Sequence, residues 1–176
     1  MATVGKTHPV ERLADGLEKA TVDDRSYRLI RLQNGMEVLL VHDLNTDRAG
    51  ASMDVGVGSY SEPDNLHGVA HFLEHLFMGT KKYPDESEYR KYIYSHSGDY
   101  NAYTADTHTN YYFEVGTRAL KGALDRFAQF FIHPLFLETT LDREREFVDS
   151  EYKKNLRSDA WRLAREGSHV SAGSAL

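Results

Sequence analysis

The sequence predicts an α+β fold in which a mostly antiparallel sheet packs against helices. β-prone segments come first in the chain, helical segments follow, and a second pair of β-prone runs lies between two of the helical segments. The chain has 176 residues, of which 40% are hydrophobic and 27% are charged, so it is long enough for one globular domain with a core. We therefore expect one α+β domain rather than a regular alternation of parallel strands and helices.

The N-terminal part of the chain supplies the first predicted strands. Residues 1–25 are expected to be a polar lead-in with a weakly helical stretch, VERLADGLEKA. Two β-prone runs, 27–33 and 36–42, flank Asn34-Gly35, a dipeptide that tolerates positive φ and therefore predicts a hairpin turn. Apolar residues then alternate with small or polar ones, which predicts a third, half-buried strand containing Ala51, Met53, Val55 and Val57.

The remaining segments predict four helices and a strand pair. One helix covers 69–78 and ends at Gly79, and PDESEYRKYIYSHSG predicts another after a proline and an acidic first turn. DYNAYTADTHTNYYFEVG is rich in Tyr and Thr and predicts two strands. A third helix ends at Pro134, and LDREREFVDSEYKKNLRSDAWRL predicts a long amphipathic helix. The third helix is indicated by the helical spacing of Leu120, Leu124, Phe127 and Phe131.

Composition excludes several classes of partner and site. A net charge of −6 argues against a surface that follows nucleic-acid phosphates. The chain has no cysteine, so any metal must be bound by His, Asp or Glu. We find neither an apolar leader nor an eighteen-residue apolar run, so we expect no membrane span and a cytoplasmic protein, with mitochondria as the alternative location.

The segment VAHFLEHLFMG carries two imidazoles and a carboxylate within five residues of an apolar run. On a helix His71 and His75 lie four residues apart on one face, so both rings can reach one ion, and Glu74 lies on the neighbouring edge. The order His-x-x-Glu-His is a signature of zinc peptidases, in which the glutamate takes a proton from an activated water. Alternatively, the histidines are ordinary helix residues and Glu74 is a solvated neighbour.

A zinc site of this kind needs a third protein ligand. His67 would extend the histidine ladder, but at about 1.5 Å rise per residue it would lie ~12 Å along the axis from His75, too far for one ion. Glu151 is the better candidate, because it shares a helical face with Phe147 and Val148 and a carboxylate on an apolar stripe needs a partner. Glu144 lies on the same face and is either a hydrogen-bonding support for a ligand or a solvated acid.

Several segments in the same order make the chain similar to the N-terminal part of the insulin-degrading enzyme and pitrilysin family of zinc metallopeptidases. The resemblance covers 26–163, where we expect a shortened N-terminal catalytic domain followed by a disordered tail, 164–176. The resemblance is carried by GVGSYSEPDN, HFLEH, GTKKYPDESEY, NAYTADTHTNYYFEV, GALDRFAQFFIHPLF and DREREFVDSEYKKNLRSDAWRL.

The resemblance implies one Zn²⁺ per chain, held by His71, His75 and Glu151. It implies that Glu74 is the catalytic base and that Glu144 supports the site. It also implies an edge strand that pairs with the backbone of peptide substrates. That strand corresponds to Asn101, Ala102, Tyr103 and Thr104, whereas Tyr111 and Phe113 are expected to serve sheet packing.

The chain departs from the family pattern in two ways. EHLFMGT is one apolar residue short, which would turn Leu76, Phe77 and Met78 by about 100° if the helix continued through them. The domains that form the other wall of the family's substrate chamber are absent from the sequence. We therefore expect a zinc metalloendopeptidase segment acting on peptides and small unfolded polypeptides. The alternative is a catalytically impaired zinc-binding module that associates with the missing domains or another subunit.

Overall fold

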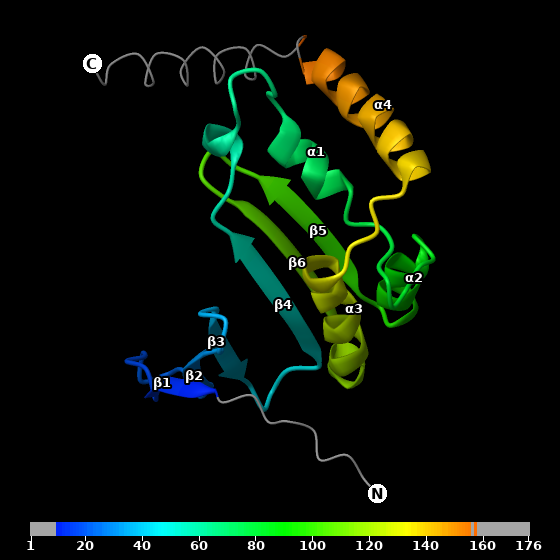
Figure 1. Ribbon diagram of the computed structural model, residues 1–176. Coiled ribbons are helices and arrows are strands. Elements are labelled where there is room, and N and C mark those ends of the chain that lie inside the picture. Colours follow the sequence, from blue (N-terminus) through cyan, green and yellow to red (C-terminus); the bar gives the residue numbers. More distant parts are fainter. Residues whose placement is uncertain (1–9, 156, 158–176) are drawn as a thin grey trace, which may run out of the picture. The chain divides into compact units, whose positions relative to one another are not determined.

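The computed structural model describes residues 10–155 and 157 of the chain (Figure 1). The chain forms two compact units with a boundary between Asp47 and Arg48. None of the described helices combines the length and the apolar composition needed to cross a bilayer. The antiparallel sheets and the helices confirm the predicted α+β class.

The first unit is a three-stranded antiparallel sheet in the order β1-β2-β3, formed by β1 Glu11–Asp15, β2 Ser26–Arg31 and β3 Glu37–His42. The predicted hairpin between β2 and β3 is confirmed. At its turn Gly35 has a φ of 87°, and its N–H donates to the Leu32 carbonyl at 2.9 Å. Such a φ is accessible to glycine without a steric penalty, which explains the Asn-Gly signal.

The helical stretch predicted at 10–20 is wrong, because β1 is a strand that pairs with β2. Two cross-strand ion pairs support that pairing: Arg28 Nε lies 2.6 Å from Asp15, and Arg31 Nη1 lies 3.2 Å from Glu11. A short isolated helix is marginal in water, and Gly16 has a φ of 69°, outside the helical region. Sheet pairing therefore overrides the weak helical pattern. Residues 1–9 of the predicted lead-in lie outside the described residues.

The second unit contains a three-stranded antiparallel sheet in the order β4-β6-β5, so that β5 lies at an edge. The predicted third strand and strand pair are thus confirmed. These strands are β4 Arg48–Val55, β5 Asp99–Thr104 and β6 Thr109–Gly116.

Four α-helices accompany this sheet: α1 Val69–His75, α2 Glu88–Ser95, α3 Leu120–Ile132 and α4 Glu138–Asn155. α1, α2 and α3 contact the sheet, whereas α4 packs against α1 (Figure 1). Short 3₁₀ turns precede α1 at Ser59–Ser61 and α3 at Thr117–Ala119. The predicted last helix extended to 163. The structure describes it as far as Asn155, and the remainder, with the tail 164–176, lies outside the described residues.

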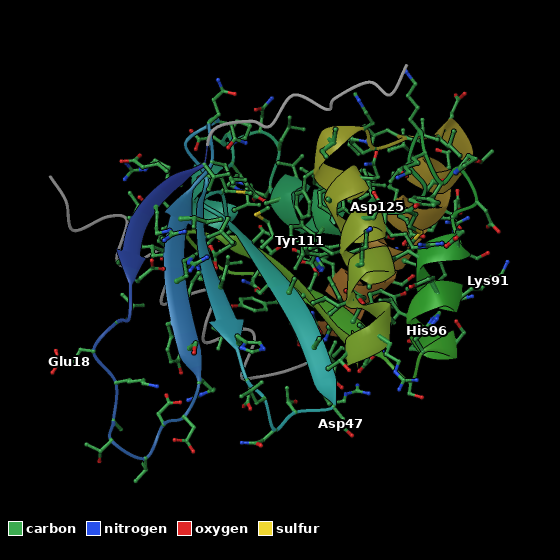
Figure 2. All side chains as sticks on the ribbon, turned by 90° about the horizontal axis from the view of Figure 1, so that it is seen from below. Glu18, Asp47, Lys91, His96, Tyr111 and Asp125 are labelled. Atoms are coloured by element: carbon green, nitrogen blue, oxygen red, sulfur yellow. The ribbon has the colours of Figure 1, made fainter. Side chains whose placement is uncertain are left out.

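The core lies between the sheet and these helices. Along β6 the odd-numbered residues are buried, and Figure 2 shows Tyr111 on the side of the sheet that carries the helices. The expected packing role of Tyr111 and Phe113 is confirmed, with 7% and 3% of their surfaces exposed. On α3 the buried residues are Ala123, Phe127 and Phe130, whereas Leu124 is 45% exposed.

The end of α1 also differs from the prediction. The helix ends at His75, not at Met78, and Leu76 is its C-cap. The shortened segment therefore leaves the helix at once, so the expected rotation of the residues after His75 does not arise. Leu76 is 5% exposed, and the Phe77 ring stacks on Tyr111 with centroids 4.5 Å apart.

Phe113→Ala is expected to lower the free energy of unfolding by about 3–5 kcal/mol, because it removes a buried aromatic ring and leaves a cavity. Phe113 packs edge-on against Phe127, with ring centroids 5.2 Å apart. The measurement is chemical denaturation. Tyr112→Ala is the matched control on the same strand, since Tyr112 is 41% exposed and should cost far less. Equal losses for both variants would contradict this description of the core.

Asp85 stabilises the start of α2, and this predicts a dependence on pH. Its carboxylate accepts hydrogen bonds from the Ser87 hydroxyl and N–H, at 2.6 and 2.9 Å. These contacts, with help from Lys91, lower the pKa of Asp85 to about 2 from its ordinary 3.8. A lowered folded-state pKa gives stability that is present above pH 3.8 and lost as the pH falls toward 2. Asp85→Asn should flatten the stability curve in this window, as measured by denaturation at several pH values, whereas the exposed Asp64→Asn control should not.

Candidate metal centre

α1 places the two motif histidines on one helical face. Its start is fixed by Glu62, whose two carboxylate oxygens accept hydrogen bonds from the N–H groups of Gly68 and Ala70 at 2.7 and 2.9 Å. One turn apart, the rings of His71 and His75 meet edge to face, with centroids 4.8 Å apart. Their Nε2 atoms lie 3.2 Å from each other, so both point to the same place.

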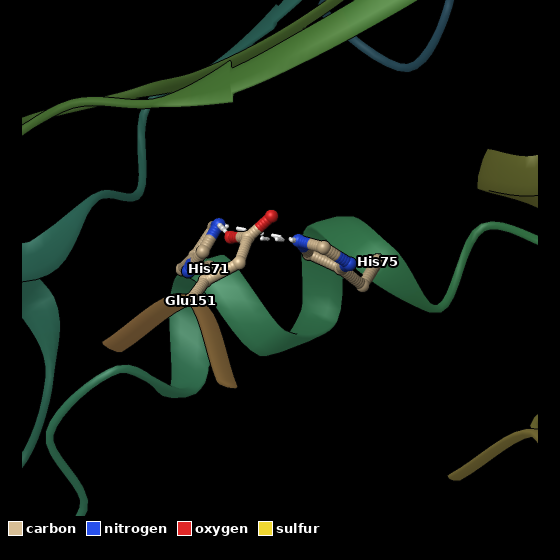
Figure 3. A group of neighbouring side chains, drawn as sticks. All are labelled: His71, His75 and Glu151. Carbon is tan, nitrogen blue, oxygen red and sulfur yellow. Dashed lines mark hydrogen bonds and ion pairs between the residues drawn. The ribbon is translucent and has the colours of Figure 1, made fainter. Parts of the chain in front are cut away.

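α4 brings Glu151 to the same place, although it lies far from the histidines in the sequence (Figure 3). Glu151 Oε2 lies 3.7 Å from Nε2 of His71 and 3.9 Å from Nε2 of His75. A triangle with these three sides has a centre about 2.1 Å from every corner, which is the usual length of zinc bonds to imidazole nitrogen and carboxylate oxygen. The donor set therefore fits a zinc ion.

Glu144 lies on the other side of the His75 ring. Its side chain is 5% exposed, and Oε2 is 3.4 Å from Nδ1 of His75. A carboxylate here favours a proton on Nδ1, which leaves the Nε2 lone pair directed toward His71 and Glu151. The burial of Glu144 argues against the second of its two considered roles, that of a solvated acid, and its support of a ligand stays a prediction.

Glu74 lines a cleft together with His75, the second of the two motif histidines. It accepts a hydrogen bond from the Thr104 hydroxyl at 2.6 Å, which joins α1 to the edge strand β5. The cleft has a volume of about 560 Å³, and Glu74, His75, Asn101 and Ala102 are among the residues that line it. Burial, with a smaller contribution from the Glu74 charge, raises the pKa of Tyr111 on the cleft wall to about 12. Glu74 thus lies on the wall of a cleft that has room for a small molecule.

The predicted substrate strand, 101–104, falls on β5. Within the described residues β5 has a sheet neighbour on one side only, and Asn101 and Tyr103 are exposed. Ala102 and Thr104 point toward the helices and are partly buried. The position suits strand addition, and the pairing of this edge with substrate stays a prediction.

His67 lies outside the group. In the part of the chain that the structure describes, the three residues whose ligand atoms lie within 4.8 Å of one another are His71, His75 and Glu151. His67 is an exposed residue before the start of α1.

Sequence reasoning missed a set of polar side chains that surrounds Glu144. Arg143 Nε donates to Glu144 Oε1 at 3.0 Å, and Arg143 Nη2 donates to Glu86 Oε2 at 2.8 Å. Glu86 also accepts a hydrogen bond from the Thr140 hydroxyl. That bond and the contact with Arg143 lower the pKa of Glu86. The Arg143-Glu144 dipeptide on the predicted last helix is the sequence signal for these contacts. The loop that carries their partner Glu86 could not be identified from the sequence.

Comparisons with known proteins show which family this chain resembles in sequence and in fold. Residues 37–173 match the family model described as Insulinase (Peptidase family M16). A Schizosaccharomyces pombe protein, mug138, whose name assigns it provisionally to the zinc proteases, is 63% identical over 89% of this chain and 16% of its own length. The insulin-degrading enzyme of Homo sapiens is 52% identical over 88% of this chain and 15% of its own length.

The crystal structure of pitrilysin superposes with a TM-score of 0.84 at 37% identity, and the match covers 90% of this chain and 17% of pitrilysin. The chain thus spans about one sixth of the length of these relatives. The family match extends over most of the sequence and includes all three residues of the proposed metal centre. This chain therefore belongs to the insulinase family of peptidases, family M16.

Proposed function

We propose that this chain is the zinc-binding segment of a metalloendopeptidase that hydrolyses peptides and small unfolded polypeptides. The observation that carries the proposal is the triangle of His71, His75 and Glu151, whose dimensions suit one zinc ion. Relatives that are named as zinc protease and insulin-degrading enzyme support the same chemistry.

Each residue of the site has a separate role in the proposed hydrolysis. His71, His75 and Glu151 would hold the ion, which as a Lewis acid lowers the pKa of a coordinated water to about 7. Glu74 accepts a proton from the attacking water and transfers it to the amine nitrogen as the peptide C–N bond breaks. Glu144 keeps the His75 ring oriented. The edge of β5 would align the substrate backbone beside Glu74, which reduces the entropy lost on reaching the reactive geometry.

A second candidate is a zinc-binding module that is hydrolytically weak alone and associates with further domains or another subunit. The observation that favours it is that the chain covers only 15–16% of the length of its relatives. Most of the length of these relatives lies outside the matched segment, so residues elsewhere in those proteins could contact the substrate.

One experiment distinguishes these candidates. Zinc content and cleavage of a quenched fluorescent peptide are measured on the purified 176-residue chain, with and without a chelator. One equivalent of zinc together with chelator-sensitive cleavage supports the peptidase. One equivalent of zinc with no cleavage supports the module. A chain that binds no zinc contradicts both.

A further inference from the structure

Arg143 connects the candidate metal centre to two other parts of the second unit. Its guanidinium donates through Nε to Glu144 and through Nη2 to Glu86, at 3.0 and 2.8 Å. The same Nη2 lies 3.4 Å from the sulfur of Met78. One side chain thus joins α4 to the segment that follows α1 and to the loop before α2.

The two oxygens of Glu144 have different neighbours. Oε1 accepts the hydrogen bond from Arg143, and Oε2 faces Nδ1 of His75 at 3.4 Å. Because Glu144 is only 4% exposed, water has little access to replace either neighbour. The contact at Oε1 therefore determines the direction in which Oε2 is presented to the imidazole.

Arg143 is in turn held from outside the metal centre. Glu86 receives hydrogen bonds from two α4 side chains, those of Thr140 and Arg143. Thr140 is 1% exposed, so the hydrogen bond that it donates to Glu86 is buried on the Thr140 side. The hydrogen bond from Thr140 and the contact with Arg143 lower the pKa of Glu86, which keeps it ionised opposite the guanidinium.

We propose that Arg143, fixed by Glu86, is a positioning residue for the metal centre, which it orients through Glu144 and the His75 ring. The inference rests on the proposed function, because it requires a metal ion at His71, His75 and Glu151. This role differs from that of an ordinary ion pair between a helix and a loop. Such a pair would stabilise the fold whether or not Glu144 is a carboxylate, whereas a positioning residue affects the metal only through Glu144.

The test measures zinc affinity of the 176-residue chain by competition with a chromophoric chelator. Arg143→Ala is expected to weaken zinc binding by about 10-fold or more, the range seen when partners of metal ligands are removed. Glu86→Gln should give a smaller loss in the same direction. Arg145→Ala is the matched control, because Arg145 lies on the same helix, is exposed and forms an ion pair at 3.4 Å with the exposed Asp142. It should bind zinc like the unsubstituted chain.

A double-mutant cycle separates positioning from general stability. In a Glu144→Gln background, Arg143→Ala should change zinc affinity by less than about twofold, because the route through Glu144 is already lost. Two results would overturn the inference. One is that Arg143→Ala lowers zinc affinity equally with and without Glu144→Gln. The other is that Arg143→Ala does not lower zinc affinity when Glu144 is unchanged. If Arg143→Ala does not fold, as judged by circular dichroism, the same cycle is run with Glu86→Gln. An unsubstituted chain that binds no zinc would instead refute the proposed function, and this inference with it.

Discussion

Glu74→Gln is expected to lower peptide hydrolysis by about 10²–10⁴-fold while zinc binding is retained, because a general base of this kind contributes about that factor. The amide keeps the size of the side chain and can still accept the hydrogen bond from Thr104, which is 2.6 Å long in the structure. It cannot accept a proton from water at neutral pH. Hydrolysis is measured with a quenched fluorescent peptide, and zinc content is measured on the same sample.

The matched control is Glu146→Gln, which removes an exposed carboxylate from α4. It should leave both hydrolysis and zinc content unchanged. Hydrolysis by Glu74→Gln at the rate of the unsubstituted chain would remove Glu74 from the mechanism. Loss of zinc from Glu74→Gln would show that the side chain acts on the metal centre rather than on the water.

Glu151→Gln is expected to weaken zinc binding by more than about 100-fold, because partners that only support a metal ligand already contribute about 10–100-fold. The neutral amide is a poor substitute for a carboxylate ligand, and it removes the carboxylate that lies beside the Nε2 atoms of the two imidazoles. Competition with a chromophoric chelator measures the change. Since Glu151 comes from α4 and both histidines come from α1, the loss would also show that zinc links these two helices.

Glu146→Gln again serves as the control, because Glu146 lies on the same helix and away from the ligand group. A Glu151→Gln chain that binds zinc as tightly as the unsubstituted one would show that the third ligand lies elsewhere.

Local patterns predicted most of the fold correctly, and tertiary pairing explains the exceptions. Asn34-Gly35 specified its hairpin because the turn geometry depends on those two residues alone. The strand at Glu11–Asp15 could not be predicted, because its own sequence has a weakly helical pattern and the strand is stabilised by pairing with β2. The helical spacing around Leu124 predicted α3, yet periodicity alone does not say which of its residues meet the sheet, and Leu124 is 45% exposed.

The candidate site was predictable where spacing within one helix defines the geometry. The His71 and His75 pair follows from the i, i+4 rule. Glu151 was a candidate because an acid on an apolar stripe needs a partner, but its approach to the histidines depends on how α4 packs against α1. Glu86 and Arg143 were missed for the same reason, since a loop and a helix far apart in the sequence meet only in the folded chain.

Anomalous scattering from crystals of the zinc-loaded chain would test directly whether His71, His75 and Glu151 bind one zinc ion. We expect one peak at the zinc absorption edge, about 2.1 Å from Nε2 of each histidine and from a carboxylate oxygen of Glu151. A peak at any other group of residues, or none at these three in a chain that contains zinc, would contradict this expectation.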